Sequence, residues 1–318
     1  MSPPEGVRGP FRLEGGHIDE LNRVFSESFT ERYHRDGMTG VRVPQLNPVV
    51  WRYAIDSAGD GAMHWRDDTG AMVAFNLAHA SGREGWMGPL AVRPDWQARR
   101  LGRTIVTEGI RYLEGRGCTT LGLETMPRTV DNIGFYSRLG FRPGHLTVSL
   151  VREVGRAPIA AGARPAPAGD REGLIEEARA LVDGLAPGLD FSREARLTLD
   201  RSLGDVTLVR HGGRPRALAI WHSVPLAAGR SADEIRILKL AAADSTGFKE
   251  VVRGVIREAA ARGLGRVGIR CQTGFRAAYG DLIDLGFKVH WTDLRMLYDD
   301  RLEPAVPPGA VIFSNWEI

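Results

Sequence analysis

The residues best suited to chemistry lie in a loop of the first half, Gln97-Ala98-Arg99-Arg100-Leu101-Gly102. The loop follows an apolar run, 87–92, that predicts a strand, and it precedes a helix expected to begin at Thr104, whose apolar residues within 105–113 are spaced as on one helix face. A turn from strand to helix presents unpaired backbone N–H groups at the positive end of the helix dipole. Such a turn binds phosphate, and a glycine lets the anion approach the backbone. Considered alone, an arginine-rich loop is more often a solvated surface turn than an anion site.

A second set of polar residues follows in the same stretch. The segment 119–125 predicts a strand, and the next helix, which ends at Gly140, carries Asn132 and Tyr136. Thr129 or Asp131 is the expected N-cap of that helix. The elements that must position both sets therefore run strand, loop, helix, strand, helix.

Together these motifs resemble the GNAT superfamily of N-acetyltransferases. That family's signature is Gln or Arg-x-x-Gly-x-Gly or Ala between a strand and a helix. An Asn and a Tyr four residues apart follow before a Leu-Gly-Phe, as Asn132, Tyr136 and Leu139-Gly140-Phe141 do here. Gln97 and Gly102 match the hexapeptide, whereas Arg100 replaces its first glycine. The resemblance implies an α/β (α+β) fold with a mixed, mostly antiparallel sheet flanked by helices.

The resemblance also implies an enzyme that transfers an acyl group from acetyl-CoA, or another acyl-CoA, directly to a primary amine of a small molecule or peptide. In that family the amides of residues 98–103 would hold the pyrophosphate, while those of residues 90–92 would hold the pantetheine arm and polarise the thioester carbonyl. The cofactor-binding residues so implied are Leu90, Ala91, Val92, Gln97, Ala98, Arg99, Arg100, Leu101, Gly102, Arg103, Thr104, Asn132 and Tyr136. No metal is expected.

Two residues are predicted to move protons. A phenol of pKa about 10 can protonate a departing thiolate whose acid has a pKa of about 8.5, so Tyr136 is the expected general acid, with a core tyrosine as the alternative. Glu124 ends the strand at which this family often places a carboxylate, and it is the expected base, directly or through a water. A surface salt bridge is the alternative for Glu124, and His34 and His79 are weaker candidates for the base.

The segment 30–55 lies over the acceptor site in the family, so Tyr33, His34 and Trp51 are predicted substrate contacts. Each could instead be a packing residue. The sequence does not identify the acceptor, because acceptor loops vary within one fold.

Composition excludes several other classes of protein. The 318 residues are 43% hydrophobic and 25% charged, as in an ordinary globular protein. No apolar run reaches the length of about 18 residues that a membrane helix needs, and no signal core precedes the first strand, so a cytoplasmic location is expected. The basic residues are scattered, which argues against nucleic-acid binding. Cys118 and Cys271 are expected to be reduced thiols. A monomer or homodimer is expected.

The chain also repeats itself. A displacement of 146 residues without gaps brings Arg116-Gly117 onto Arg262-Gly263 and Leu139-Gly140-Phe141 onto Leu285-Gly286-Phe287. We therefore predict two tandem GNAT-like domains, 1–154 and 170–318, joined by a Gly/Ala/Pro-rich linker, 155–169. In the first domain, residues 62–79 predict a hairpin with its turn at Asp68-Thr69-Gly70, and residues 145–153 predict the strand that closes the domain.

The same displacement removes the chemical residues from the second copy. Gln97 falls on Ala243, Gly102 on Phe248, Asn132 on Ala278 and Tyr136 on Leu282. The second copy is thus expected to be degenerate and not to bind CoA in the usual way, although a turn shifted to Gly247 stays open.

The apolar tail, 311–318, is predicted to dock as an edge strand of the second sheet or across the domain interface. Some tandem GNATs similar to this chain use a C-terminal carboxylate as a base, which here would be that of Ile318. An alternative to the enzyme is a non-catalytic protein that senses acyl-CoA or binds a partner. The retention of Gln97, Gly102, Asn132 and Tyr136 in one copy favours the enzyme.

Overall fold

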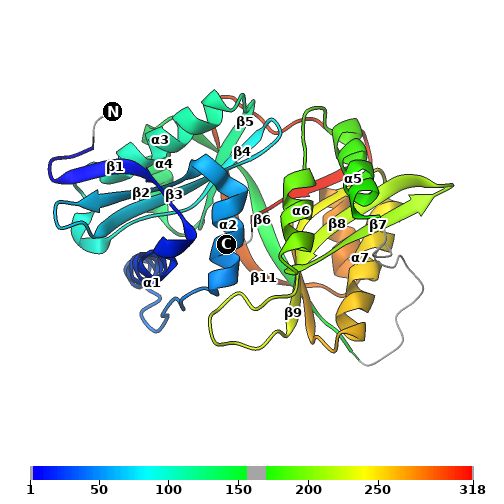
Figure 1. Ribbon diagram of the computed structural model, residues 1–318. Helices are drawn as coiled ribbons and strands as arrows, with labels where there is room; N and C mark the ends of the chain where they lie inside the picture. The colour runs from blue at the N-terminus through cyan, green and yellow to red at the C-terminus, as the bar shows by residue number, and fades with distance from the viewer. Residues whose placement is uncertain (1–2, 156–169, 317–318) are drawn as a thin grey trace.

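The computed structural model describes residues 3–155 and 170–316. Its strands form one continuous mixed sheet in the order β1-β2-β3-β4-β5-β11-β6-β10-β9-β8-β7, and β12 pairs with β9 off this path. Figure 1 shows two groups of strands and helices, one on each side of β6 and β11. The mixed α/β architecture predicted from the sequence is confirmed. The predicted linker, apart from Gly155, and the Ile318 carboxylate lie outside the described residues.

The first half contains four α-helices and six strands. In chain order these are β1 (Val7–Arg12), α1 (Ile18–Arg35), α2 (Pro48–Ala58), β2 (Ala62–Asp67), β3 (Met72–Ser81), β4 (Glu84–Val92), α3 (Leu101–Gly115), β5 (Thr120–Thr125), α4 (Val130–Arg138) and β6 (Phe141–Glu153). The predicted hairpin is confirmed, because β2 and β3 pair across a turn that the Asp67 carboxylate caps. Helix α3 begins three residues earlier than the apolar spacing indicated, and the segment 30–55 contains most of α2.

The second half contains four α-helices and six strands among the described residues. In chain order these are α5 (Arg171–Leu185), α6 (Ser192–Asp200), β7 (Gly204–His211), β8 (Arg214–His222), β9 (Glu234–Ala242), α7 (Ser245–Ala261), β10 (Arg266–Gln272), α8 (Arg276–Asp284), β11 (Lys288–Tyr298) and β12 (Val311–Ser314). A displacement of 146 residues carries the bounds of α4 onto those of α8.

The two halves exchange a strand at their junction. Strand β6 was expected to close the first half, but it pairs with β10 and β11, whereas β11 of the second half pairs with β5. Where β6 and β11 meet, Thr147 lies opposite Asp293, 146 positions later in the chain. Residues related by the displacement therefore face each other at the centre, as in an approximate two-fold arrangement, and each half completes the other's sheet.

Amphipathic helices bury both faces of the sheet. The apolar face of α3, which includes Ile105, Val106 and Leu113, packs on β3, β4 and β5. Helix α7 packs in the same way on β8, β9 and β10, with Phe248 and Val252 fully buried. Helices α1 and α2 cover the opposite face of β3 and β4. No helix in the described ranges is long and apolar enough to span a membrane.

The connection between β9 and α7 differs from its counterpart between β4 and α3. Strand β4 pairs with β5 in parallel from Glu84↔Thr120 to Met87↔Leu123, and β9 pairs with β10 from Glu234↔Arg266 to Ile237↔Ile269. Eight residues separate β4 from α3, but only Ala243 and Asp244 separate β9 from α7. The mapping is therefore wrong for residues 97–100, because the second half lacks most of that loop, whereas Leu101 and Gly102 still correspond to Gly247 and Phe248 within the helices.

Candidate active site

The loop between β4 and α3 has the backbone that an anion-binding turn requires. Ala98 and Arg100 both adopt left-handed backbone, with φ of 61° and 67°. Arg100 is the N-cap of α3, so the N–H groups of Leu101, Gly102 and Arg103 in the first helical turn have no partner within the helix. Successive amides in left-handed and helical conformation form a concave donor surface. Arg100 therefore holds the conformation that a glycine would adopt more easily.

A cavity of about 300 Å³ opens at this turn. It is lined by Val92, Gln97, Ala98, Arg100, Gly102, Arg103, Phe135, Arg138 and Leu139. A Cβ added at Gly102 would lie 3.3 Å from the Phe135 ring, so glycine leaves room between α3 and α4. The turn supplies backbone donors, Arg100 and Arg103 to one cavity, and α4 adds Arg138; this arrangement fits a phosphorylated ligand.

The remaining residues of the predicted set have different surroundings. The Gln97 side chain donates to the Val92 carbonyl at 3.1 Å and thereby fixes the start of the loop. The Arg99 guanidinium lies 4.7 Å from the centre of the Trp96 ring. Leu101 and Thr104 are buried on the inner face of α3 and hold the helix rather than line the cavity.

Strand β4 separates from β5 just before residues 90–92, which are predicted to hold the pantetheine arm. Its pairing with β5 ends at Met87, and an irregularity at Gly88 and Pro89 interrupts its pairing with β3. Leu90, Ala91 and Val92 pair with β3 on one side and with no strand of the described chain on the other. That open edge can bind an extended ligand as a neighbouring strand would.

Asn132 and Tyr136 lie on α4 as predicted. The Asn132 amide donates to Thr125 at 3.5 Å, at the end of β5. Burial raises the pKa of Tyr136, which packs against Phe135 and Phe141 and is only 7% exposed. The phenol therefore keeps its proton at neutral pH and can act as a hydrogen-bond donor. Thr129 is the N-cap of α4, but its hydroxyl makes no capping hydrogen bond with the helix and instead donates to the Asp36 carboxylate.

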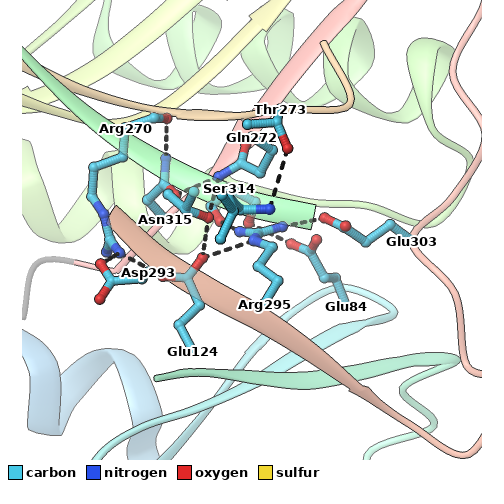
Figure 2. A network of polar contacts seen from close by, with 12 residues as sticks. Glu84, Glu124, Arg270, Gln272, Thr273, Asp293, Arg295, Glu303, Ser314 and Asn315 are labelled. Atoms are coloured by element: carbon cyan, nitrogen blue, oxygen red, sulfur yellow. Dashed lines mark hydrogen bonds and ion pairs between the residues drawn. The ribbon is translucent and has the colours of Figure 1, made fainter. Parts of the chain in front are cut away.

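Glu124 is held by two arginines of the second half (Figure 2). Its carboxylate accepts from Arg270 at 2.6 Å, from Arg295 at 2.8 Å and from Thr147 at 2.5 Å. Burial alone would raise the pKa of Glu124, but Arg270 and Arg295 outweigh it and lower the pKa to about 2. A carboxylate with so low a pKa binds a proton weakly at pH 7, so these contacts favour an anchoring role over that of a base.

Asp293 is a second carboxylate beside the same guanidinium (Figure 2). It accepts from Arg270 at 2.7 Å and from the Trp291 indole at 3.3 Å. Burial raises the pKa of Asp293 although Arg270 opposes it, and the nearby Glu124 raises it further. Two carboxylates that share Arg270 thus have pKa values pushed in opposite directions, as acid–base pairs in enzymes often do.

Asp293, Arg270 and Arg295 were not among the predicted site residues. They lie 146 to 171 positions after Glu124 in the chain, and no motif marks them. One signal was available: the 146-residue displacement carries Glu124 onto Arg270 and Thr147 onto Asp293. The contacts Glu124–Thr147 and Arg270–Asp293 are equivalent under this displacement.

The predicted acceptor contacts do not come together. Tyr33 on α1 lies 6.4 Å, ring centre to ring centre, from the partly exposed Trp291 of β11. His34 is exposed and bonds to the Val41 carbonyl at 2.9 Å. Trp51 is fully buried, with its indole bonded to Asn22, and it offers no surface to an acceptor. Burial raises the pKa of Tyr33, and the nearby Asp293 raises it further. Tyr33 is thus the member of this set that lies near Asp293.

His79 is fully enclosed and cannot serve as a base for an acceptor from solvent. Burial lowers the pKa of His79 to about 3, so the ring is neutral. Its Nε2 lies 3.0 Å from the Gly88 carbonyl, to which it donates because a carbonyl can only accept.

The start of α7 carries a carboxylate where α3 has its open turn. Asp244 is the N-cap of α7 and accepts from the Gly247 amide at 2.8 Å. A bound carboxylate at a helix N-terminus satisfies a donor that a phosphate would need and repels the phosphate charge. The shifted turn at Gly247 is therefore capped by the chain itself.

These features are those of one class of protein, the acyl-CoA-dependent transferases. The model of the Acetyltransferase (GNAT) family matches residues 19–141, which span the open turn, β5 and α4. The resemblance to the GNAT family predicted from the sequence is therefore supported over residues 19–141.

Named relatives agree with that class. The chain is 36% identical over 140 residues to mycothiol acetyltransferase of Streptomyces coelicolor, covering 43% of each chain. It is 38% identical over 72 residues to [ribosomal protein bS18]-alanine N-acetyltransferase of Escherichia coli, covering 23% of this chain and 49% of the relative. The chain therefore spans less than half of these two relatives.

The fold likeness extends over nearly the whole chain. The structure of Saccharomyces cerevisiae N-myristoyltransferase with bound myristoyl-CoA covers 96% of this chain and 81% of its own, with a TM-score of 0.64 at 13% identity. At this identity the likeness establishes the fold alone. Within the described residues no group of His, Cys, Asp and Glu side chains is arranged to hold a metal ion.

Proposed function

We propose that this chain is an N-acyltransferase that transfers an acetyl group from acetyl-CoA directly to a primary amine of a small molecule or peptide. The observation that carries the proposal is the continuity of the open β4 edge at Leu90–Val92 with the unpartnered amides and arginines at the start of α3. An extended ligand that ends in phosphates fits this combination. The acetyltransferase relatives support the reaction class.

Each residue of the site has a proposed part in acyl transfer. Amides of residues 98–103 would hold the pyrophosphate, with Arg99, Arg100 and Arg103 balancing its charge. The Leu90 amide would donate to the thioester carbonyl, where negative charge develops. Acetyl-CoA supplies the activated acyl group. Tyr136 would donate a hydrogen bond to the sulfur, and Asn132 would bond the arm.

We assign the base to Asp293 and an anchoring part to Glu124. An acceptor amine is mostly protonated at neutral pH, so it needs a carboxylate with appreciable proton affinity. Asp293 has that affinity because burial raises its pKa, and it lies beside Tyr33 and Trp291 on a partly open surface. Glu124 instead fixes Arg270, whose guanidinium orients Asp293.

We further propose that the chain is a tandem of two GNAT-like units, 1–154 and 170–318, of which the second is degenerate. The equivalence of α4 with α8, together with the exchanged β6 and β11, supports the repeat. The Asp244 cap and the short link before α7 support the loss of the second CoA site.

The test is calorimetric titration of acetyl-CoA into the wild-type chain and into Gly102→Glu. A carboxylate within the open turn would repel the pyrophosphate by several kcal/mol, so binding should weaken at least about 100-fold. Gly115→Glu is the matched control, because it adds the same charge at the far end of α3, where a Cβ meets nothing within 4 Å. We expect one site per chain, retained in the control; a second site would overturn the degenerate assignment.

The alternative is a non-catalytic protein that senses acyl-CoA or binds a partner. One observation favours it: the arginine-locked Glu124 and the buried Tyr136 are both poor proton-transfer groups as they stand. Acetyl-CoA binding without release of free CoA across a panel of primary amines would support this alternative.

A further inference from the structure

The C-terminal segment Val311–Trp316 joins both halves of the molecule. Its strand β12 pairs antiparallel with β9, from Val311↔Ala242 to Ser314↔Lys239. This pairing begins just beyond Ile237, where the parallel pairing of β9 with β10 ends. In the first half the same stretch of β4 has an open edge. The second half therefore fills with its own tail the opening that the first half leaves for a ligand.

Beyond β12, Trp316 lies between two buried side chains from different halves. Its ring stacks on the His79 imidazole of β3, with ring centres 4.2 Å apart and planes inclined by 19°. The Lys239 ammonium of β9 lies 3.6 Å from the centre of the Trp316 ring. Trp316 thus holds the His79 ring by stacking. Trp316 is itself held by a cation–π contact with Lys239, which is stronger because the ammonium is shielded from water.

His79 passes this restraint to the candidate active site. Its neutral ring donates to the Gly88 carbonyl at 3.0 Å, within the irregularity of β4 that precedes Leu90. No strand pairs with this part of β4 on the side of β5 in the described chain, and its pairing with β3 is interrupted between Met87 and Leu90. The bond from His79 is therefore one of the contacts that set the backbone just before the Leu90 amide.

Ser314 reaches the other side of the same centre (Figure 2). Its carbonyl accepts from Arg295 at 2.5 Å, and Arg295 donates to Glu124 at 2.8 Å. The Ser314 hydroxyl contacts the buried Glu84 carboxylate of β4 and accepts from Lys239 at 3.0 Å. One tail residue thereby contacts β4 of the first half and the arginine that anchors Glu124.

We propose that two residues at the end of the tail, Ser314 and Trp316, are positioning residues of the first-half active site. Trp316 orients the β4 irregularity through His79, and Ser314 holds Arg295 on Glu124. This inference rests on the proposed transferase function. It assigns the second half a part in catalysis that does not require a second CoA site.

The test compares Trp316→Ala with Trp316→Phe and Phe313→Leu. Phe313 is fully buried in β12 among second-half side chains, so Phe313→Leu weakens tail docking without removing the His79 stack. We expect Trp316→Ala to lower kcat by about tenfold or more, since small misplacements at a reacting centre are costly, with KM for acetyl-CoA changed less than about threefold. Trp316→Phe should retain most of the wild-type kcat. Phe313→Leu should retain kcat even though it lowers Tm as much as Trp316→Ala does.

Hydrogen exchange of the β4 peptide, 84–92, supplies a readout that needs no turnover. Exchange should become faster in Trp316→Ala and stay unchanged in Phe313→Leu. If neither exchange nor kcat responds to Trp316→Ala, or both controls respond equally, the positioning role is refuted. If exchange responds as expected while the wild type transfers no acyl group, the positioning contact stands and the proposed function fails.

Discussion

The sharpest prediction concerns Glu124→Gln, because the structure gives its magnitude. Lowering a carboxyl pKa from its ordinary 4.5 to about 2 corresponds to about 3 kcal/mol of folding free energy at neutral pH. The substitution also leaves Arg295, whose side chain is 2% exposed, without one of its two carboxylates. Breaking one side of a buried ion pair costs about 3–5 kcal/mol. We therefore expect Glu124→Gln to lose about 3–5 kcal/mol at pH 7.

The pH dependence of that loss has a definite sign. A depressed carboxyl pKa stabilises the folded chain above the unfolded pKa, and the stabilisation is lost as the pH falls toward the folded pKa. The difference between wild type and Glu124→Gln should therefore narrow between pH 4.5 and pH 2, with about 1.4 kcal/mol of it gone at pH 3.5.

Urea denaturation of both chains at pH 7, 5 and 3.5 measures this difference. Glu176→Gln, which removes an exposed ion pair with Arg179 on α5, is the matched control and should leave the stability unchanged at every pH. A loss below about 1 kcal/mol at pH 7, or one that does not vary with pH, would refute the anchoring role of Glu124.

The remaining predictions concern the base, the turn, the degenerate unit and the exchanged strands. Asp293→Asn should lower kcat/KM about 10²–10⁴-fold and remove the acid limb of the pH–rate profile; a retained limb would exclude Asp293 as the base. Arg100→Gly should raise the free energy of unfolding by up to about 1 kcal/mol, measured by thermal unfolding. Left-handed backbone costs a non-glycine residue about 1–2 kcal/mol, and the substitution recovers only part of this because glycine loses more chain entropy on folding. Arg100→Gly should also weaken acetyl-CoA binding in calorimetry, whereas Ala98→Gly should not. Asp244→Ala should cost about 1 kcal/mol of stability and create no second acetyl-CoA site. A chain ending at Gly155 should aggregate in light scattering, because β5 and β6 lose the partners that cover their edges; a soluble, folded fragment would show that the exchange is dispensable.

The local elements of the fold could be predicted because local rules determine them. The apolar spacing of 105–113 gives α3, and Asp68-Thr69-Gly70 gives the β2–β3 turn. The start of α3 was missed by three residues because Arg100 supplies the left-handed N-cap, a conformation that a search for glycine overlooks. Trp51 was misassigned because the segment was interpreted as an acceptor loop, although Asn47 followed by Pro48 is a helix-start signal.

The site could be predicted only where one half builds it alone. The turn 97–103 and the pair Asn132 and Tyr136 belong to a single stretch of chain, so their spacing was informative. The surroundings of Glu124 could not be read from spacing, because Arg270 and Arg295 reach it through strands that the two halves exchange. A pKa depends on such distant charges, which explains why a carboxylate at the expected position has properties unlike those of a base.

The exchange of β6 and β11 gives the second half a structural part that does not depend on a CoA site of its own. Under the 146-residue displacement, Glu124 with Thr147 corresponds to Arg270 with Asp293, and the two pairs meet at the centre of the sheet. If both halves kept a glutamate there, two carboxylates would face each other in a buried place at a cost of several kcal/mol. An arginine at 270 turns this repulsion into an ion pair and leaves Asp293 beside the first-half site. In the proposed assignment the second half thus supplies a guanidinium, a carboxylate and a tail to the first-half site, a part that it can keep without an open turn of its own.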